Sequence, residues 1–293
     1  MAGITHEPED GVNPMHFGLY EAGGEEGSGF HVFNIAPNHY HRAEVLQRSG
    51  AIDITCDLER VLHGAMSADS DYYATLMVMH WSFKAKNTRR ISEANIELLF
   101  EPGLSGSDIE VEQVSFKDTY SLMPTTQQES ITQGGEANIG VAYGASIGVG
   151  AKWEKTVSAE KTDAITLYGV RQLVNNIPPY RIARWIVSEN ETQPAGIPAS
   201  LKVAVLVSRQ DREQFTCKVG FSCKTDRKTA VQSLFKKIPK DDPIIFQPNP
   251  RDKGTRPSRN VSYGHDELGS VDIDEYCDVT FRTIIKDGQK VWK

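Results

Sequence analysis

The sequence predicts an all-β fold, mainly antiparallel: a β-sandwich or flattened barrel with one or two short helices. Apolar and polar residues alternate with a period of two in many stretches of the 293-residue chain, which is typical of strands with one buried face. These stretches follow one another without a strand–helix–strand rhythm, so a parallel sheet is not expected.

The clearest alternation runs from Ile139 to Trp153. Its odd positions are apolar, aromatic or alanine, and its even positions are small or polar, with glycine at 140, 144, 148 and 150. We expect one long strand whose odd face packs into a core and whose glycine-lined face lets a second layer approach closely. The polar stretch before it, Pro124 to Gln133, is predicted to be a loop.

Two further patterns predict particular strands. Tyr73 to Phe83 is apolar on both faces, as in a central strand. Leu201 to Val207 and Phe215 to Thr225 read as a hairpin joined by Gln210-Asp211-Arg212. In its second arm Cys217 and Cys223 share the apolar face, which predicts buried, reduced thiols.

Two segments have the apolar spacing of helices. Asp57 could cap a short helix with Leu58, Val61, Leu62 and Ala65 on one face. Asp226 to Ile238 has a possible cap, an apolar stripe, lysines in its last turn and a proline after its end.

The amino-acid composition limits the possible domain organisation and the possible classes of protein. Residues 1–29 are rich in Gly, Glu and Pro and are predicted to be a disordered tail, followed by a single β-rich domain over 30–293 with a polar loop near 249–260. The net charge of −7 disfavours nucleic acid or an anionic membrane as a general partner. The first residues lack the features of a signal peptide and no 18-residue apolar run occurs, so we expect a soluble, cytoplasmic protein.

No spacing of residues predicts a catalytic site or a cofactor. The chain has no nucleophile elbow, no phosphate-binding loop and no glycine-rich turn that opens a helix. His39 and His41 are weak candidates for metal ligands because no third ligand follows at a suitable spacing. Candidates for lining a ligand pocket are the aromatic residues of the predicted strands: Tyr73, Trp81, Trp153, Tyr168 and Trp185.

Two further motifs are the basis of a resemblance to another group of proteins. They are Trp185-x-x-x-Glu189-Asn190 followed by Gly196-Ile197-Pro198, and Asp241-Asp242-Pro243-Ile244-Ile245-Phe246-x-Pro248. With the glycine-rich strand, they resemble a group of uncharacterised proteins predicted in filamentous ascomycete fungi, over roughly Arg42 to Pro248. The resemblance implies a fungal source and brings no known activity or catalytic residue.

The sequence is compatible with three functions. The first is a module that binds a protein partner or a small apolar ligand. The second is an enzyme of the cavity type, an isomerase or cyclase that holds an apolar metabolite of fungal secondary metabolism by shape and a few polar groups. The third is a protein that inserts a β-hairpin into a membrane.

The sequence favours binding over insertion. Lys161 and Asp163 would place charges in the strand after Trp153, and Thr125 to Gln133 is polar, so the alternating strand lacks a lipid-compatible neighbour. We therefore expect no membrane permeabilisation.

Overall fold

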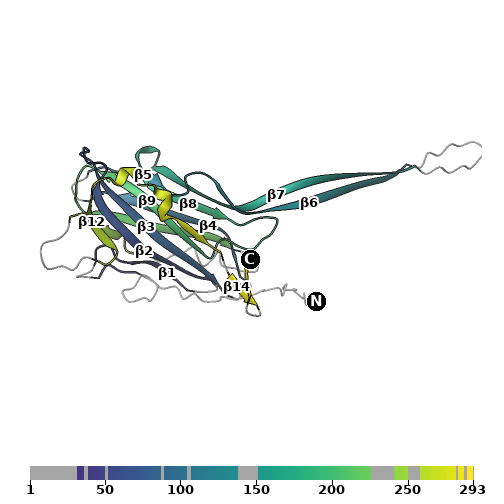
Figure 1. Cartoon of the computed structure of the whole chain (residues 1–293), viewed down its shortest axis with the longest axis horizontal. Coiled ribbons are helices and arrows are strands. Elements are labelled where there is room, and N and C mark those ends of the chain that lie inside the picture. Colours follow the sequence, from purple (N-terminus) through teal and green to yellow (C-terminus); the bar gives the residue numbers. More distant parts are fainter. Residues whose placement is uncertain are drawn as a thin grey trace, which may run out of the picture.

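Two sheets packed face to face form the body of the protein (Figure 1). The structure is a computed structural model and describes residues 32–35, 39–49, 52–86, 89–103, 107–137, 151–225, 241–249, 258–281, 283–286 and 289–292. Within these residues the fold is all-β and mainly antiparallel, an open sandwich and not a closed barrel, which confirms the predicted class. The helices among them are two short 3₁₀ turns, η2 (Leu268–Ser270) and η3 (Ile273–Tyr276).

The first sheet has the order β1-β2-β3-β9-β13, with β12 beside β2 and β5 beside β9. Its strands are β1 (Glu44–Arg48), β2 (Ile52–Ala65), β3 (Tyr73–Ala85), β5 (Ile109–Val114), β9 (Ser200–Arg209), β12 (Val261–His265) and β13 (Asp278–Thr280). The strand predicted over Tyr73–Phe83 is β3, and it lies in the interior of this sheet between β2 and β9, as its two apolar faces require.

The second sheet has the order β11-β10-β4-β8-β7-β6, which makes β6 an edge strand. Its strands are β4 (Ile91–Glu101), β6 (Tyr120–Ala137), β7 (Ala151–Val174), β8 (Ile177–Ser188), β10 (Phe215–Thr225) and β11 (Ile244–Phe246). A separate two-stranded sheet pairs β14 (Thr283–Lys286) with β15 (Gln289–Trp292).

The space between the sheets is filled by apolar side chains from both of them. Trp81 of β3 stacks on Phe221 of β10 with ring centroids 5.4 Å apart, and both residues belong to one continuous buried cluster. Trp185 of β8 is fully buried and donates its indole N–H to the carbonyl oxygen of Ser115 at 3.0 Å. Gly169 of β7 faces Trp185 in the ladder, and a Cβ at this position would collide with the same carbonyl oxygen.

The helix predicted after Asp57 is wrong, because residues 58–65 belong to β2. A β-bulge between Leu58 and Arg60 shifts the register against β3. The bulge moves the buried positions from even to odd numbers, so Leu58, Val61 and Leu62 acquire the spacing of a helical face within a strand. The second predicted helix, Asp226 to Ile238, lies outside the described residues.

The hairpin predicted over Leu201–Thr225 is also wrong. Both of its strands form, but β9 lies between β3 and β5 in the first sheet while β10 pairs with β4 and β11 in the second. Because both edges of β9 are already taken over most of its length, the chain crosses between the sheets at residues 210–214. Of its two cysteines, Cys217 is fully buried and Cys223 is half-buried against the core.

The loop predicted over Pro124–Gln133 is wrong as well, because these residues continue β6. Pro124 is compatible with the strand because β6 is an edge, where a missing N–H leaves no neighbour unpaired. A one-residue bulge between Leu122 and Thr125 accommodates the proline, and Met123 there has a φ of 50°.

Candidate functional site

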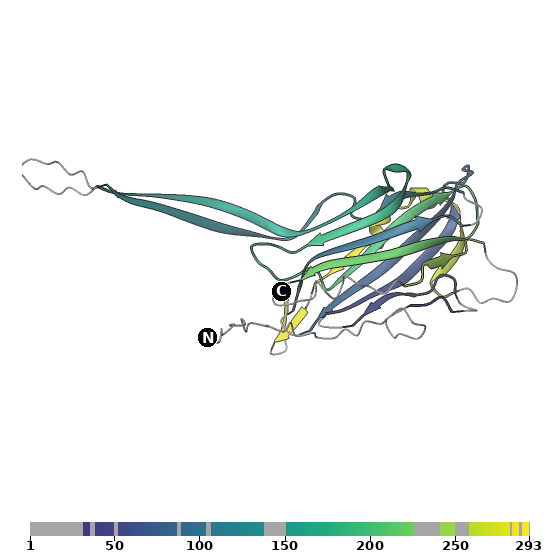
Figure 2. The same cartoon turned by 180° about the vertical axis from the view of Figure 1, so that it is seen from behind.

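The most distinctive part of the structure is the β6–β7 hairpin, which leaves the sandwich as a long two-stranded ribbon (Figures 1 and 2). Its ladder runs unbroken from Thr125↔Asp163 to Ala137↔Ala151, thirteen consecutive pairs. We call residues 125–137 and 151–163 the ribbon. At 3.2–3.4 Å per residue, it is about 40 Å long.

The ribbon begins where the pairing changes. Tyr120 to Leu122 of β6 still pair with Ile165 to Leu167 of β7 inside the sandwich, where Ile165 and Leu167 are buried. The bulge at Met123–Pro124 then separates this section from the ribbon. Bulges bend a strand and increase its twist, which explains why the hairpin departs from the sheet at this point.

Asp163, at the root of the ribbon, is held by the loop that follows β8. One carboxylate oxygen of Asp163 accepts a hydrogen bond from the backbone N–H of Thr192 at 2.8 Å. The backbone oxygen of Asp163 accepts a second from the side-chain amide of Asn190 at 3.1 Å. Asn190 is buried, and its side-chain carbonyl oxygen accepts hydrogen bonds from the backbone N–H groups of Thr192 and Gln193.

These bonds correct one premise of the sequence analysis. The charge of Asp163 was expected to face lipid in the strand after Trp153, but Asp163 is hydrogen-bonded to the loop after β8 at the root of the ribbon. The strand predicted over Ile139–Trp153 lies outside the described residues except for Ala151 to Trp153. These three residues begin β7 in the outer part of the ribbon, so their expected packing into the core is wrong.

The register sorts the ribbon residues into two sets, because paired residues of an antiparallel ladder lie on the same face. The even-numbered pairs contain no apolar residue: Thr126↔Thr162, Gln128↔Glu160, Ser130↔Ser158, Thr132↔Thr156, Gly134↔Glu154 and Glu136↔Lys152. The odd-numbered pairs hold every apolar residue of the ribbon: Thr125↔Asp163, Gln127↔Lys161, Glu129↔Ala159, Ile131↔Val157, Gln133↔Lys155, Gly135↔Trp153 and Ala137↔Ala151. Apolar pairs therefore begin at Ile131 and are confined to the outer part of one face.

A second cluster surrounds the candidate metal ligand His41, in the sandwich. The Nε2 atom of His41 lies 3.0 Å from Nε2 of His63 and also accepts the backbone N–H of Gln247 at 3.0 Å. His63 Nδ1 lies 2.8 Å from the Thr75 hydroxyl, which accepts from Arg209 at 3.0 Å. This pattern fits two neutral imidazoles, with His63 donating to His41.

Burial keeps both imidazoles uncharged. It lowers the pKa of His41 to about 4. Burial, then the nearby His41, Arg209 and His265, lowers the pKa of His63 well below its usual value. The single Nε2 lone pair of His41 is shared by the N–H groups of Gln247 and His63. The sequence analysis missed the contact with His63 because the two histidines lie 22 residues apart. Within the described ranges no three His, Cys, Asp or Glu side chains are grouped as a metal site.

The five aromatic candidates for a ligand pocket come from separate places in the described part of the chain. Trp81 and Trp185 belong to the filled core. Tyr73, half-buried at the start of β3, lies under the guanidinium of Arg212, 4.5 Å from the ring centroid. Tyr168 is half-buried in β7, and Trp153 belongs to the ribbon. Their role in ligand binding stays a prediction.

Comparisons with known proteins add little. No family model and no curated protein matches the chain. Among solved structures, it is similar to the Clostridium perfringens NetB toxin in the membrane-inserted form, at 8% identity over 63% of this chain and 83% of that one, with a TM-score of 0.29. It is also similar to Clostridium perfringens delta-toxin, at 10% identity over 62% and 86% of the two chains, with a TM-score of 0.24. Scores this low support no conclusion about function.

None of the helices in the described part of the chain has the length and apolar character needed to cross a bilayer. The resemblance to fungal proteins stays a prediction.

Proposed function

We propose that the protein acts on membranes and inserts the β6–β7 hairpin into the lipid bilayer. The observation that carries this proposal is the ribbon: thirteen pairs outside the sandwich, whose apolar residues all fall on one register face. This reverses the preference of the sequence analysis, which placed binding first.

The ribbon is long enough to cross a lipid bilayer. A membrane-spanning β-strand needs about 9–11 residues to cross a hydrocarbon core of roughly 30 Å. Each arm of the ribbon has thirteen residues. The root, from Thr125 to Gln128 on β6, is polar on both faces and would stay in the headgroup region.

The residue pattern of the outer ribbon supports the same function. Membrane strands alternate apolar residues toward lipid with polar or small residues toward a water-filled interior. The odd set supplies Ile131, Val157 and Trp153, and the even set is polar or glycine throughout. In the sequence, residues 138–150 join the two arms, and Ile139, Val141, Ile147 and Val149 continue the apolar odd set. Lys155, paired with Gln133, is the charged exception on the odd face between the apolar pairs.

A single hairpin cannot complete this function. Both outer edges of a two-stranded ribbon leave backbone N–H and C=O groups unpaired, and each unpaired group costs several kcal/mol in hydrocarbon. Several copies therefore pair their hairpins edge to edge into a closed sheet. An isolated two-stranded hairpin is at best marginally stable in water. Pairing with the hairpins of other copies therefore also stabilises the ribbon.

The second candidate is the binding module that the sequence analysis favoured. The free edges of the ribbon support it, because an exposed strand edge can add a strand from another protein. A cavity enzyme has less support, since buried apolar side chains of both sheets fill the described interior.

Release of a trapped dye from liposomes tests the proposal, with variants matched by register. Ile131→Asp and Val157→Asp place a charge on the lipid face at one register pair, whereas Ser130→Asp and Ser158→Asp place the same charge one residue away. We expect the parent to release dye, the two odd variants to lose at least tenfold in rate, and the two even variants to stay within about threefold. A lipid-facing charge at mid-bilayer costs roughly 2–4 kcal/mol for Lys or Arg and less for Asp.

Absence of leakage by the parent across neutral and anionic lipids would contradict insertion and leave the binding module. Equal loss in odd and even variants would contradict the assignment of faces. Circular dichroism and thermal unfolding of all variants show whether the sandwich is intact, which we expect because the ribbon lies outside its core.

A further inference from the structure

Both strands of the ribbon are held near its root by segments of the sandwich. On the β7 side, the loop of residues 189–197 binds Asp163 through Asn190 and Thr192. On the β6 side, the turn η3 binds the residues that lead into β6. The two strands of the hairpin therefore have separate supports.

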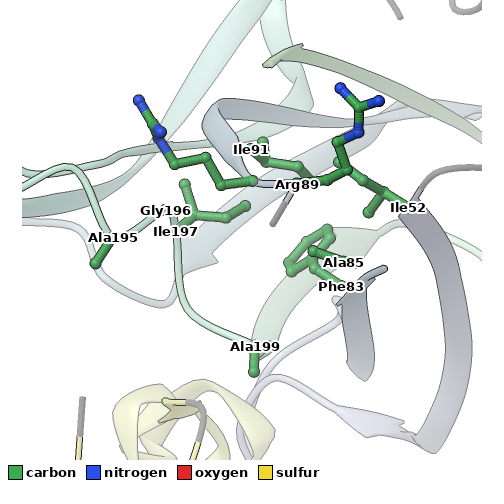
Figure 3. A pocket seen from close by; sticks show the side chains of 10 residues that line it. Ile52, Phe83, Ala85, Arg89, Ile91, Ala195, Gly196, Ile197 and Ala199 are labelled. Atoms are coloured by element: carbon green, nitrogen blue, oxygen red, sulfur yellow. The ribbon is translucent and has the colours of Figure 1, made fainter. Parts of the chain in front are cut away.

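The support on the β7 side is fixed at both ends of its loop. Ile197 lines a small apolar hollow of about 80 Å³ together with Phe83 and Ile91 (Figure 3). The backbone N–H of Ile197 donates to the carbonyl oxygen of Ile91 at 2.9 Å. Glu189, at the other end of the loop, forms an ion pair with Arg90, with 3.0 Å between Nε and Oε2. The part of the loop that binds β7 thus lies between two fixed points.

The support on the β6 side is the carboxylate of Asp274. Its Oδ1 atom accepts the backbone N–H of Phe116 at 3.1 Å, and its Oδ2 atom accepts the hydroxyl group of Tyr120 at 3.1 Å. The rings of Phe116 and Tyr120 meet edge to face, with centroids 5.2 Å apart. Tyr120 begins β6 and pairs with Leu167 inside the sandwich, before the bulge at which the ribbon begins. Asp274 therefore holds β6 on the sandwich side of that bulge.

The turn η3 gives Asp274 a defined position. Ile273 is buried in an apolar cluster with Ala204 and Leu206 of β9, which belong to the first sheet. The side chain of Asp272 caps the turn and accepts the backbone N–H of Asp274 at 3.0 Å. The Asp274 carboxylate thus connects β6, at the edge of the second sheet, to the first sheet.

We propose that Asp274 is a positioning residue that fixes the direction in which the ribbon leaves the sandwich. A ribbon supported on one strand alone can pivot at the bulge, whereas support on both strands selects one direction. Hairpins of several copies then begin with a common direction, so they lose less conformational freedom when they pair. The consequence for membranes rests on the proposed function, whereas the direction of the ribbon is a property of the protein in solution.

The distance between two spin labels tests the positioning without lipid. One label is attached at Ser130→Cys in the ribbon and the other at Lys84→Cys, an exposed position near the end of β3; the unsubstituted protein controls for labelling of native thiols. We expect a narrow distribution of distances in the parent. Asp274→Ala removes two hydrogen bonds and should broaden the distribution roughly twofold. Asp274→Asn keeps one acceptor oxygen and should recover part of the narrow distribution.

Glu275→Ala is the matched control, because it removes the same charge from an exposed position of the same turn. Tyr120→Phe removes the hydroxyl bond alone and should broaden the distribution less than Asp274→Ala does. Thermal unfolding shows whether each variant keeps the sandwich, and Tyr120→Phe provides the comparison if Asp274→Ala does not fold. An unchanged distribution in Asp274→Ala, or equal broadening by Glu275→Ala, would overturn the positioning role.

Dye release separates this inference from the proposed function. We expect Asp274→Ala to release dye roughly fivefold more slowly than the parent, the factor that corresponds to one net hydrogen bond. Asp274→Asn should recover part of the rate. Faster release by Asp274→Ala would overturn the inference, because η3 would then restrain the hairpin.

The two measurements together show which proposal fails. If the parent released no dye but Asp274→Ala broadened the distance distribution, the proposed function would fail and the positioning role would stand. If the parent released dye and Asp274→Ala left the distribution unchanged, the positioning role would fail alone.

Discussion

The side-chain amide of Asn190 donates to the backbone oxygen of Asp163 at 3.1 Å, and this bond joins the loop after β8 to the residue at which the ribbon leaves the sandwich. Asn190 belongs to one of the two motifs that carried the resemblance at the sequence level. The structure gives this motif a physical role: Glu189 faces Arg90, Asn190 supports the root of the ribbon, and Gly196 has a φ of +92°, which favours glycine.

Asn190→Ala is expected to destabilise the protein by about 1–3 kcal/mol. The substitution removes four hydrogen bonds of a buried side chain and leaves backbone N–H groups of the loop without their acceptor. Urea unfolding measures the change. Glu191→Ala, at an exposed neighbour, is the control and should change the free energy of unfolding by less than about 0.5 kcal/mol. Equal stability of the Asn190 variant and the parent would contradict the role of Asn190 in holding the loop after β8 against Asp163.

If the ribbons assemble into a channel as proposed, Glu154→Lys is expected to shift the ion selectivity of that channel toward anions. The even-numbered face of the ribbon carries Glu136, Glu154 and Glu160 against Lys152, so the interior of the assembly is negative and should prefer cations. Reversal potentials in planar bilayers under a salt gradient measure the preference. Lys155→Glu, on the other face, is the control for net charge near the same position. A reversal potential that Glu154→Lys leaves unchanged would place this residue away from the conduction path.

The stability of the protein is expected to fall as the pH decreases from about 6.5 to 4. The pKa of His41 is near 6.5 in the unfolded chain and about 4 in the folded protein, so the unfolded state binds the proton first. The slope from one such group approaches 1.4 kcal/mol per pH unit. Denaturant unfolding at pH 7, 5.5 and 4.5 measures it, and His41→Gln should have the shallower slope. Identical slopes would show that His41 titrates normally in the folded state.

Cys217 and Cys223 are expected to react slowly with thiol reagents in the native protein. Burial raises the pKa of Cys217 far above its usual value, and burial raises the pKa of Cys223 to about 12. Mass spectrometry after timed alkylation resolves each site, and 8 M urea supplies the unfolded reference. Cys223, which is half-buried, should react faster than Cys217. Rapid native labelling of Cys217 would contradict its position in the core.

The strand content was predictable because burial on one or both faces leaves a pattern in the residues themselves. Tyr73 to Phe83 has that pattern, and β3 forms there. The pairing of strands was less predictable, because the turn at Gln210–Arg212 resembles a hairpin turn while the chain in fact changes sheets. The bulge in β2 similarly produced helical spacing within a strand.

The candidate site was harder to foresee than the fold. Pro124 and the polar residues after it resemble a loop in the sequence. They belong to an edge strand outside the sandwich, and a strand without a buried face needs no alternation of apolar and polar residues. One signal was present nonetheless. Thr126 to Glu136 and Lys152 to Thr162 are polar or glycine at every even position, which a comparison of the two arms in antiparallel register could have revealed.

The environment of single positions along the ribbon tests insertion most directly. Ile131→Cys and Ser130→Cys, each labelled with a polarity-sensitive fluorophore, report neighbouring positions on opposite faces of β6; the unsubstituted protein controls for its native thiols. On addition of anionic liposomes, the probe at 131 should show a blue shift with several-fold brighter emission and quenching by lipid-attached quenchers. The probe at 130 should stay in a polar environment. Identical aqueous spectra at both positions, in vesicles to which the protein is bound, would contradict the insertion of the β6–β7 hairpin.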